Sequence, residues 1–377
     1  MKIGLTTIYT VPNFGSVLQA FATQVVLERA GAECKVINYL YPNRWNQKQT
    51  GARVSLKSKL AYLLRANPSH RMHRKLKGFI ASHFHLTRLY HSLEELQQED
   101  WSSYDAFCAG SDQIWNAKFL KGESVFMLSF APDNAYKFSL ASSFALKIVP
   151  DEYVPKYQKY LSRFDRFSVR ERQGVHILKE QLGFEQDARV MPDPTLMLSG
   201  EEWVKAVGAS PKKPKRPYIL LYGLYYAFEP RPYIFKVLKH FQEKLGCDIL
   251  ALEGYKPAEQ AEGLKMKDVK NSTITEFIQY FANAEMVVTS SFHGTAFALN
   301  FSKPLVSVVP GNKADDRQSN LLRMVGAEQC IASTELAIAD LNPFYDRNQV
   351  ESALQNLRTE SAQWISETFL SIEKYVG

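Results

Sequence analysis

The first forty residues, MKIGLTTIYTVPNFGSVLQAFATQVVLERAGAECKVINYL (residues 1–40), decide the fold class. The apolar run at 3–8 predicts a strand that is buried on both faces. Loop residues at 12–15 precede a helical stretch at 17–30, with Ser16 as the candidate N-cap and Gly31 as the C-terminal glycine. Residues 35–40 have the pattern of the next strand. Because a strand, a helix and a second strand of these lengths form a βαβ unit, we expect an α/β fold with parallel strands.

The same alternation continues along most of the 377 residues. Apolar runs predict strands at 104–109, 137–142, 166–169 and 188–190, and again at 218–222, 248–252, 286–289 and 305–309. The Pro- and Lys-rich segment 210–217 separates the two sets and is typical of a surface linker or long loop. We therefore expect two α/β lobes, at 1–196 and 217–345, followed by a C-terminal helix at 346–377.

Basic charge is concentrated in one segment of the first lobe. The 46 Lys and Arg exceed the 39 Asp and Glu by a net charge of +7, and hydrophobic residues make up 45% of the chain, which excludes a disordered or fibrous protein. No Asp or Glu occurs within 44–92, a segment that we expect to be a helical insertion with helices at 55–66 and 70–84. Eleven basic residues lie there: Arg44, Lys48, Arg53, Lys57, Lys59, Arg65, Arg71, Arg74, Lys75, Lys77 and Arg88.

Two interpretations of this basic segment stay open. It forms either a solvated face on an inserted pair of helices, or a surface at 53–88 that makes a peripheral contact with anionic lipid or with a lipid diphosphate acceptor. The rest of the chain holds the other 35 of the 46 basic residues, fewer than the 39 acidic ones. The net charge is therefore a property of this segment and not of the two lobes.

Several classes of protein are excluded by missing patterns. The apolar stretch at the N-terminus is too short for a signal peptide, and no run approaches the roughly 18 apolar residues that span a bilayer, so we expect a cytoplasmic protein. The four cysteines form no CxxC pair and no HExxH occurs, so we expect reduced thiols and no metal site. No GxGxxG, GxSxG, Walker sequence or nucleic-acid motif is present, which leaves no support for a bound dinucleotide, a serine nucleophile or a nucleic-acid partner.

Two polar loops follow predicted strands in the N-terminal half. In the first, at 13–19, Gly15 and the helix that starts at Ser16 can direct backbone N–H groups to an anion, although an ordinary βα turn explains them as well. The second, at 110–116, presents a hydroxyl, a carboxylate, amides and an indole, a mixture that suits a sugar. The alternative is that Ser111 or Asp112 caps a helix and that Trp115 belongs to the core.

Two further loops carry an arginine and a histidine at strand ends. Arg170 is suited to bidentate recognition of a carboxylate or phosphate, but a solvated pair with Glu171 is an equal explanation. The loop at 289–295 continues an apolar strand with hydroxyls, then His293, then a glycine that opens a helix. Since imidazole titrates near neutral pH, His293 is the best candidate for proton transfer, with a core or capping histidine as the alternative.

Taken together and in this order, these loops resemble the polysaccharide pyruvyl transferase family. The matching segments are KIG at 2–4, NFGSVLQA at 13–20, VINY at 36–39, YD at 104–105, GSDQIWN at 110–116, SVRE at 168–171, DPT at 193–195 and SFHG at 291–294. The resemblance extends over about residues 1–330. It implies two Rossmann-like lobes like those of glycosyltransferase-B enzymes, and transfer of pyruvate from phosphoenolpyruvate to two hydroxyls of one sugar. The product would be a cyclic ketal in a bacterial-type cell-surface polysaccharide or its lipid-linked precursor, and phosphate would be released.

The resemblance also implies roles for single residues. His293 would be the general acid or the phosphate partner, and Arg170 would hold the donor. Ser291 stands where some members of the family have an arginine, so Arg317 in a later loop is the candidate for the missing cation. The donor subsite would then contain Ser290, Ser291, Gly294, Arg317, Gly15 and Ser16, and the acceptor subsite Asn13, Asp112, Gln113, Trp115 and Asn116. Phosphoenolpyruvate is the donor substrate in this scheme, and we expect no cofactor.

Two other functions stay open at this point. A sugar-nucleotide-dependent glycosyltransferase of the same architecture would release a nucleotide instead of phosphate, and fold alone does not exclude it. A non-catalytic protein that binds an anionic surface would explain the basic segment. If the sugar acceptor is lipid-linked, we expect the protein at the inner face of the cytoplasmic membrane.

Overall fold

The computed structural model describes residues 1–43, 68–210, 214–225, 228–252, 264, 266–311 and 317–377. The chain divides into two compact units. Unit 1 comprises Met1–Asn67, Lys77–Met197 and Leu357–Gly377, and unit 2 comprises Pro68–Leu76 and Leu198–Asn356. Two helices, α3 (Pro68–His83) and α14 (Arg347–Val376), contribute residues to both units.

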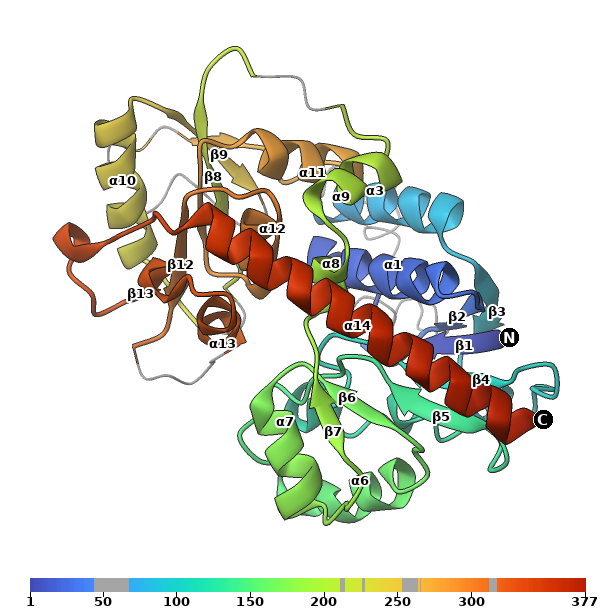
Figure 1. The fold of residues 1–377 in the computed structure, drawn as a ribbon. Helices are drawn as coiled ribbons and strands as arrows, with labels where there is room; N and C mark the ends of the chain where they lie inside the picture. Colours follow the sequence, from blue (N-terminus) through green and yellow to red (C-terminus); the bar gives the residue numbers. More distant parts are fainter. Residues whose placement is uncertain (44–67, 211–213, 226–227, 253–263, 265, 312–316) are drawn as a thin grey trace, which may run out of the picture. The chain divides into compact units, whose positions relative to one another are not determined.

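Unit 1 is built on a parallel five-stranded sheet with strand order β3-β2-β1-β4-β5 (Figure 1). The strands are β1 (Lys2–Thr6), β2 (Glu33–Tyr39), β3 (Leu86–Tyr90), β4 (Ala106–Ala109) and β5 (Tyr136–Ser139). A two-stranded parallel sheet of β6 (Phe167–Val169) and β7 (Ala188–Val190) continues from β5 through a bridge between Phe138 and Arg166. In this order β1 is central, β2 and β3 are added on one side of it, and β4 and β5 on the other. This is the strand order of a Rossmann-like half.

The helices of unit 1 connect these strands. They are α1 (Phe14–Arg29), the second half of α3, α4 (Leu93–Gln97), α5 (Ala117–Leu120), α6 (Val154–Leu161), α7 (Arg172–His176), which continues into a π turn at Ile177–Gln181, α8 (Pro194–Met197) and the second half of α14, with short 3₁₀ turns at Ser124–Met127 and Asp151–Tyr153. Helices α1 and α3 lie side by side, and the rings of Phe21 and Phe79 meet edge to face at 5.3 Å. In α14, Arg358 donates to the carbonyl of Leu196 at 3.1 Å.

One face of the unit 1 sheet is packed with aromatic rings. Trp101 contacts Phe107 and Phe130 with ring centroids 5.6 Å and 5.3 Å away. Gly4 on β1 is required by this packing, because a Cβ at that position would lie 2.8 Å from the ring of Phe107. This aromatic layer covers the face of β1 that carries Gly4, so β1 is buried from Ile3 to Thr6.

Unit 2 contains a parallel six-stranded sheet with strand order β10-β9-β8-β11-β12-β13. The strands are β8 (Tyr218–Tyr222), β9 (Asp248–Leu252), β10 (Met266–Asp268), β11 (Met286–Thr289), β12 (Leu305–Val309) and β13 (Ile331–Ser333). The helices are the first half of α3, α9 (Gly200–Ala206), α10 (Tyr233–Leu245), α11 (Ile274–Asn283), α12 (Phe292–Asn300), α13 (Arg317–Met324) and the first part of α14, with 3₁₀ turns at Glu328–Cys330 and Ile338–Asp340. This is the strand order of a complete Rossmann fold.

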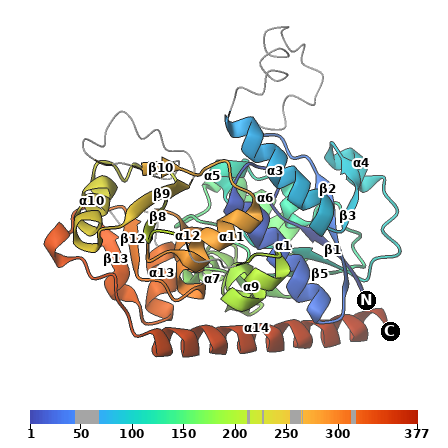
Figure 2. The ribbon, with the colours of Figure 1, turned by 90° about the horizontal axis from the view of Figure 1, so that it is seen from above.

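Helices cover both faces of the unit 2 sheet (Figure 2). Alternate residues of β8 and β9, including Ile219, Leu221 and Ile249, form an apolar core with α10. On the other face, Tyr222 packs against Phe277 of α11 at 5.4 Å, and Phe277 packs against Phe297 of α12 at 5.3 Å. The central strands β8, β11 and β12 are therefore buried on both sides, as their continuous apolar sequences predict.

The structure corrects two expectations from the sequence. Asn13, and not Ser16, is the N-cap of α1: its side chain accepts the Ser16 N–H at 3.2 Å, and Ser16 lies inside the first turn. The insertion at 44–92 is not helical to its end, because 86–90 is the edge strand β3. The longer stretch of unit 2 starts at Leu198, before the segment 210–217 that was expected to separate the lobes. The helix expected at 55–66 lies outside the described residues.

Two further observations concern membrane-spanning helices and cysteines. Within the described ranges, no helix is long and apolar enough to cross a membrane. The cysteines Cys34, Cys108, Cys247 and Cys330 are all free thiols and all buried.

Candidate functional site

His293 lies in the first turn of α12, just beyond the carboxyl end of β11. Ser291 caps this helix, and its side chain accepts the N–H of Gly294 at 3.4 Å. The imidazole is buried, with 7% of the residue exposed, and its ring meets that of Phe292 edge to face. Because the first turn of a helix directs backbone N–H groups outward, the imidazole lies at a helix end of the kind that can bind an anion.

The position of α12 is set by close packing onto β8 and β11. The Thr289 hydroxyl donates to the carbonyl of Tyr222 at 2.6 Å and accepts the N–H of Ser291 at 3.0 Å. A side chain at Gly294 would overlap that same hydroxyl, so glycine is required there. Ser290 is held as well, since its hydroxyl both donates to and accepts from the backbone of Leu224. The hydroxyls around His293 thus fix the loop that carries it.

A chain of buried hydrogen bonds ties α12 to α13, which follows the neighbouring strand. Thr295 shares a 2.8 Å hydrogen bond with Ser307 of β12, and the Gln318 amide donates to the same Ser307 hydroxyl at 2.8 Å. Gln318 is the second residue of α13, and Arg317 is the first. Because β11 and β12 are parallel neighbours, Arg317 and His293 both follow carboxyl ends of adjacent strands in unit 2. We refer to Ser290, Ser291, His293, Gly294 and Arg317 as the unit 2 cluster.

A second polar cluster lies at the carboxyl ends of β1 and β4 in unit 1. Asp112 has a positive φ of 72°, a conformation that aspartate tolerates better than most residues. Its carboxylate accepts the Ser16 hydroxyl at 2.7 Å and the Gln113 N–H at 2.8 Å. Ser16 is in turn held by Asn13, so the two loops predicted to be polar are joined directly.

The remaining residues of this cluster follow Asp112 along the chain. The Asn116 side chain donates to the Gln113 amide oxygen at 2.9 Å and caps α5 by accepting the Phe119 N–H. Burial raises the pKa of the Tyr41 phenol, and the negative charge of Asp112 raises it further, so Tyr41 keeps its proton. We refer to Asn13, Ser16, Asp112, Gln113 and Asn116 as the unit 1 cluster. It combines a carboxylate, amides and hydroxyls, the groups that hydrogen-bond to sugars.

Arg170 forms a buried ion-pair network behind this cluster. Its Nη1 donates to Asp193 Oδ2 at 2.7 Å, and its Nε to Glu171 Oε1 at 3.2 Å, with only 3% of its side chain exposed. Ser111 donates to the same Asp193 oxygen at 2.9 Å, and Ser143 donates to the same Glu171 oxygen at 2.5 Å. The network therefore holds the backbone on both sides of Asp112, because the Ser143 N–H also donates to the carbonyl of Asp112.

The structure decides two of the alternatives left by the sequence. Trp115 belongs to the core: it is fully buried, its indole donates to the carbonyl of Phe126, and its ring packs against Phe144. It therefore presents no face to a sugar within unit 1. Arg170 and Glu171 do pair, but the pair is buried and not solvated. Neither Ser111 nor Asp112 caps a helix, and Gly15 is buried within α1.

Sequence reasoning did not select Asp193, Ser111 or Ser143 as site residues. Asp193 lies 23 residues after Arg170, and the register of β6 and β7 brings the two together, with Val169 opposite Val190. The sequence does contain one indication of this pair, because Arg170 and Asp193 each follow a predicted parallel strand. Among the described residues, no group of three or more His, Cys, Asp or Glu side chains is arranged to hold a metal ion.

Comparison with solved structures identifies the fold. The chain is similar to S. aureus MnaA in a co-structure with UDP, with a TM-score of 0.52 and 12% sequence identity over 100% of this chain and 97% of that one. It is also similar to UDP-GlcNAc 2-epimerase from Methanocaldococcus jannaschii, with a TM-score of 0.50 and 11% identity over 94% and 92% of the two chains. At such identities the similarity concerns the fold alone. It confirms two Rossmann-like lobes of the glycosyltransferase-B type.

Comparison of the sequence gives a family as well. No curated protein matches the chain. A family model described as polysaccharide pyruvyl transferase matches residues 13–312. Every residue of the unit 1 cluster lies within the matched region, as does the unit 2 cluster except for Arg317.

Proposed function

Because this chain belongs to the polysaccharide pyruvyl transferase family, we propose that it transfers pyruvate from phosphoenolpyruvate to two hydroxyls of one sugar residue. The acceptor is a cell-surface polysaccharide or its lipid-linked precursor, and the product is a cyclic ketal. The observation that carries the proposal is His293, buried in the first turn of a helix and inside the region matched by the family. An acid and an anion-binding helix end are what this donor requires at one place.

The proposed reaction is balanced without any further reactant. A proton adds to the methylene carbon of phosphoenolpyruvate, and the first sugar hydroxyl adds to the neighbouring carbon with loss of its proton. The bond from that carbon to the phosphate oxygen then breaks, and the second hydroxyl takes the place of phosphate and loses its proton. The net products are the ketal and inorganic phosphate. The donor needs cations and N–H groups for its phosphate and carboxylate, and an acid for its methylene carbon.

We assign the donor to the unit 2 cluster. The first turn of α12 is suited to the phosphate, because helix N-termini bind anions through their N–H groups and dipole. His293 in that turn is the proposed general acid, and Arg317 at the start of α13 supplies the cation that Ser291 lacks. Ser290 and Gly294 act by holding the loop, since the Ser290 hydroxyl is bonded to Leu224 and Gly294 allows the close contact with Thr289.

We assign the sugar hydroxyls to the unit 1 cluster. Asp112 is the proposed partner of an acceptor hydroxyl, and the amides of Gln113 and Asn116 provide further hydrogen bonds. Ser16, expected near the donor, donates to Asp112 and is better suited to orienting that carboxylate. Arg170 acts as a positioning residue, because its guanidinium is buried between Asp193 and Glu171.

The proposal predicts phosphate release from phosphoenolpyruvate that depends on a sugar acceptor. The purified chain would be incubated with phosphoenolpyruvate and a panel of free, nucleotide-linked and lipid-linked sugars. Phosphate would be measured by a coupled assay, and the acceptor by mass spectrometry. We expect the acceptor to gain the mass of one pyruvate less one water. If a nucleotide is released from a sugar nucleotide, and phosphoenolpyruvate is not consumed with any acceptor, the chain is a glycosyltransferase and the proposal is wrong.

We also propose that α3 contacts an anionic lipid surface. Its residues Met72, Leu76 and Phe79 are buried, whereas Arg71, Arg74, Lys75 and Lys77 are exposed. The apolar face is therefore used within the protein, and the contact would be electrostatic and not an insertion. Residues 53–67 of the expected contact surface at 53–88 lie outside the described ranges, so the proposal concerns α3 alone.

Charge reversal on α3 tests the lipid contact. Each basic residue near an anionic bilayer contributes about 1 kcal/mol, so we expect R71E/R74E/K77E to bind phosphatidylglycerol vesicles at least about tenfold more weakly in co-sedimentation. Lys75 is left unchanged because it lies 3.5 Å from Glu276. The matched control is K236E/K239E/K244E on α10, whose three lysines are also exposed. Equal binding by the two variants would rule out α3 as the contact.

A further inference from the structure

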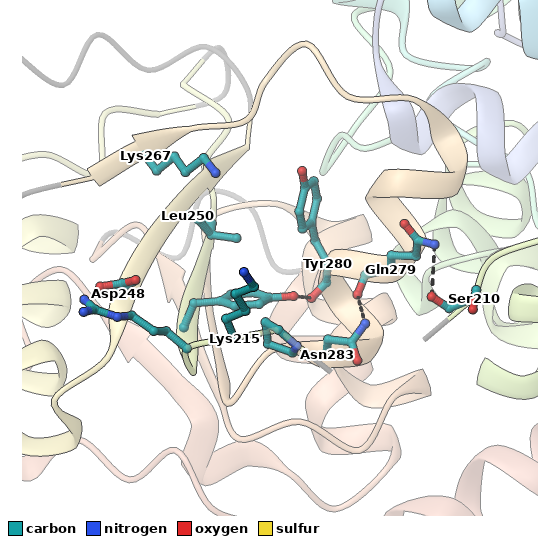
Figure 3. A pocket seen from close by; sticks show the side chains of 11 residues that line it. Ser210, Lys215, Asp248, Leu250, Lys267, Gln279, Tyr280 and Asn283 are labelled. Atoms are coloured by element: carbon teal, nitrogen blue, oxygen red, sulfur yellow. Dashed lines mark hydrogen bonds between the residues drawn. The ribbon is translucent and has the colours of Figure 1, made fainter. Parts of the chain in front are cut away.

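Unit 2 contains a cavity of about 640 Å³ that is separate from the unit 2 cluster. It lies at the amino ends of β8 and β9, over the sheet face opposite α10, and is bordered by the last turns of α11. Figure 3 shows Lys215, Lys267 and Tyr280 around Leu250, which forms part of the cavity lining. His293 follows the carboxyl end of β11 in the same parallel sheet, whereas the cavity is at the amino ends of β8 and β9. The cavity and His293 therefore lie at opposite ends of the strands.

The cavity carries three basic side chains from two separate segments. Lys215 and Arg216 lead into β8, and Lys267 is on the edge strand β10, where it pairs in register with Leu250. All three are exposed, and in the part of the chain that the structure describes none of them forms an ion pair. Asp248 is the single acidic residue among the described lining residues. The cavity is therefore positively charged and suited to an anion.

The backbone around the cavity argues against a compact phosphate. Phosphate groups in α/β folds usually bind at helix N-termini beyond the carboxyl ends of strands. Here the nearest helix end is the C-terminal part of α11, which carries Tyr280 and Asn283. The helix dipole places a negative partial charge at this end, which is unfavourable for an anion. The cations are on side chains from different segments, and such a distribution suits carboxylates spread along an extended ligand better than one phosphate group.

The rest of the lining suits a carbohydrate. The Tyr280 side chain and the partly exposed Leu250 offer apolar surface, on which the apolar face of a sugar ring can lie. The side-chain amides of Gln279 and Asn283 offer hydrogen bonds beside it, and both are oriented by hydrogen bonds, to Ser210 at 3.1 Å and to Gln279 at 2.9 Å. A volume of this size accommodates a ligand larger than one sugar ring.

We propose that this cavity is an exosite for a carboxylate-bearing segment of the polysaccharide, apart from the site of transfer. The inference rests on the proposed function, because each pyruvate ketal adds one carboxylate to the polymer. A chain that has already been modified is therefore more anionic than a fresh acceptor. The exosite holds this modified segment through Lys215, Arg216 and Lys267, and keeps a long acceptor on the enzyme between transfers.

The test is direct binding of a hexamer of uronic acid, measured by isothermal titration calorimetry without phosphoenolpyruvate. We expect the unaltered protein to bind this hexamer with an affinity that falls as salt rises, and K215A/R216A/K267A to lose at least about tenfold. The matched control K205A/K236A/K239A removes three exposed lysines outside the cavity and should bind like the unaltered protein. A neutral glucose hexamer should bind much more weakly to all three proteins.

The outcomes separate this inference from the proposed function. Turnover of phosphoenolpyruvate without charge-dependent binding of the uronic acid hexamer would overturn the exosite alone. Binding that depends on the three cations, without turnover on any acceptor, would overturn the proposed function and support the exosite. In a competition experiment, UDP, pyrophosphate or additional uronic acid hexamer would be added to displace the bound hexamer. If UDP or pyrophosphate acts at a lower concentration than the additional hexamer, the cavity is a phosphate site and the inference is overturned. With turnover present, K215A/R216A/K267A should raise KM for a polymeric acceptor and leave a single-sugar acceptor unaffected.

Discussion

Replacing His293 with alanine is expected to lower kcat with phosphoenolpyruvate by about 10²- to 10⁴-fold, the usual contribution of a positioned general acid. The imidazole is buried in the first turn of α12, where the Ser291 cap and the close contact of Gly294 with Thr289 hold the backbone. Loss of the ring removes the proposed acid for the methylene carbon but leaves the N–H groups that are proposed to bind phosphate. The decrease should therefore be found in kcat more than in KM.

Three measurements make this prediction specific. His293→Gln keeps polar volume and should lose activity as alanine does, while its thermal midpoint stays near that of the unaltered protein. The control His176→Ala removes an exposed histidine from α7 and should keep full activity. A large rise in KM at unchanged kcat would instead make His293 the phosphate partner. Near-normal kcat and KM in both His293 variants would exclude the residue from the chemistry.

The architecture was predictable because both sheets are parallel and covered. Strands of this kind are buried on both faces, so they appear as short continuous apolar runs between helical patterns, as at Lys2–Thr6 and Met286–Thr289. The edge strand Leu86–Tyr90 was missed for the same reason. It contains the exposed residues Arg88 and Leu89 and lies at the end of a basic segment, so its sequence has no buried-strand pattern.

The candidate site was predictable only in part, because local sequence does not tell which way a side chain points. His293, Asp112 and Ser16 follow predicted strands and do lie at strand ends. Trp115 stands in the same polar loop as Asp112, yet the backbone turns it into the core beside Phe144. Asn13 and Ser16 are both good N-cap residues three positions apart, and only the path of the chain selects Asn13. Pairing across β6 and β7 joined Arg170 to Asp193, which no local pattern contains.

Removing the Asp193 carboxylate is expected to lower the free energy of unfolding by about 3–5 kcal/mol, the cost of leaving a buried charge without its partner. Asp193 is completely buried, and its two oxygens accept from Arg170, Ser111 and Thr195. In Asp193→Ala the buried Arg170 guanidinium keeps the Glu171 carboxylate and loses that of Asp193. Arg170→Ala should cost a similar amount, because it leaves two buried carboxylates. The double variant should cost clearly less than the sum of the two, as expected for residues in one network.

An exposed ion pair in the same unit shows whether burial, and not charge alone, causes the expected loss of stability. Lys179 and Asp187 lie 3.0 Å apart in the same unit, but the Asp187 side chain is 98% exposed, so Lys179→Ala should leave stability nearly unchanged. Urea denaturation followed by tryptophan fluorescence measures all four variants, and the Ser111–Asp112 turn beside the network should loosen with the loss of Asp193. If Arg170→Ala instead keeps full stability and raises only KM for phosphoenolpyruvate, Arg170 binds the donor directly. Its role as a positioning residue would then be wrong, since a guanidinium that is released to the donor at no cost in stability cannot be what holds Asp193 and Glu171 in place.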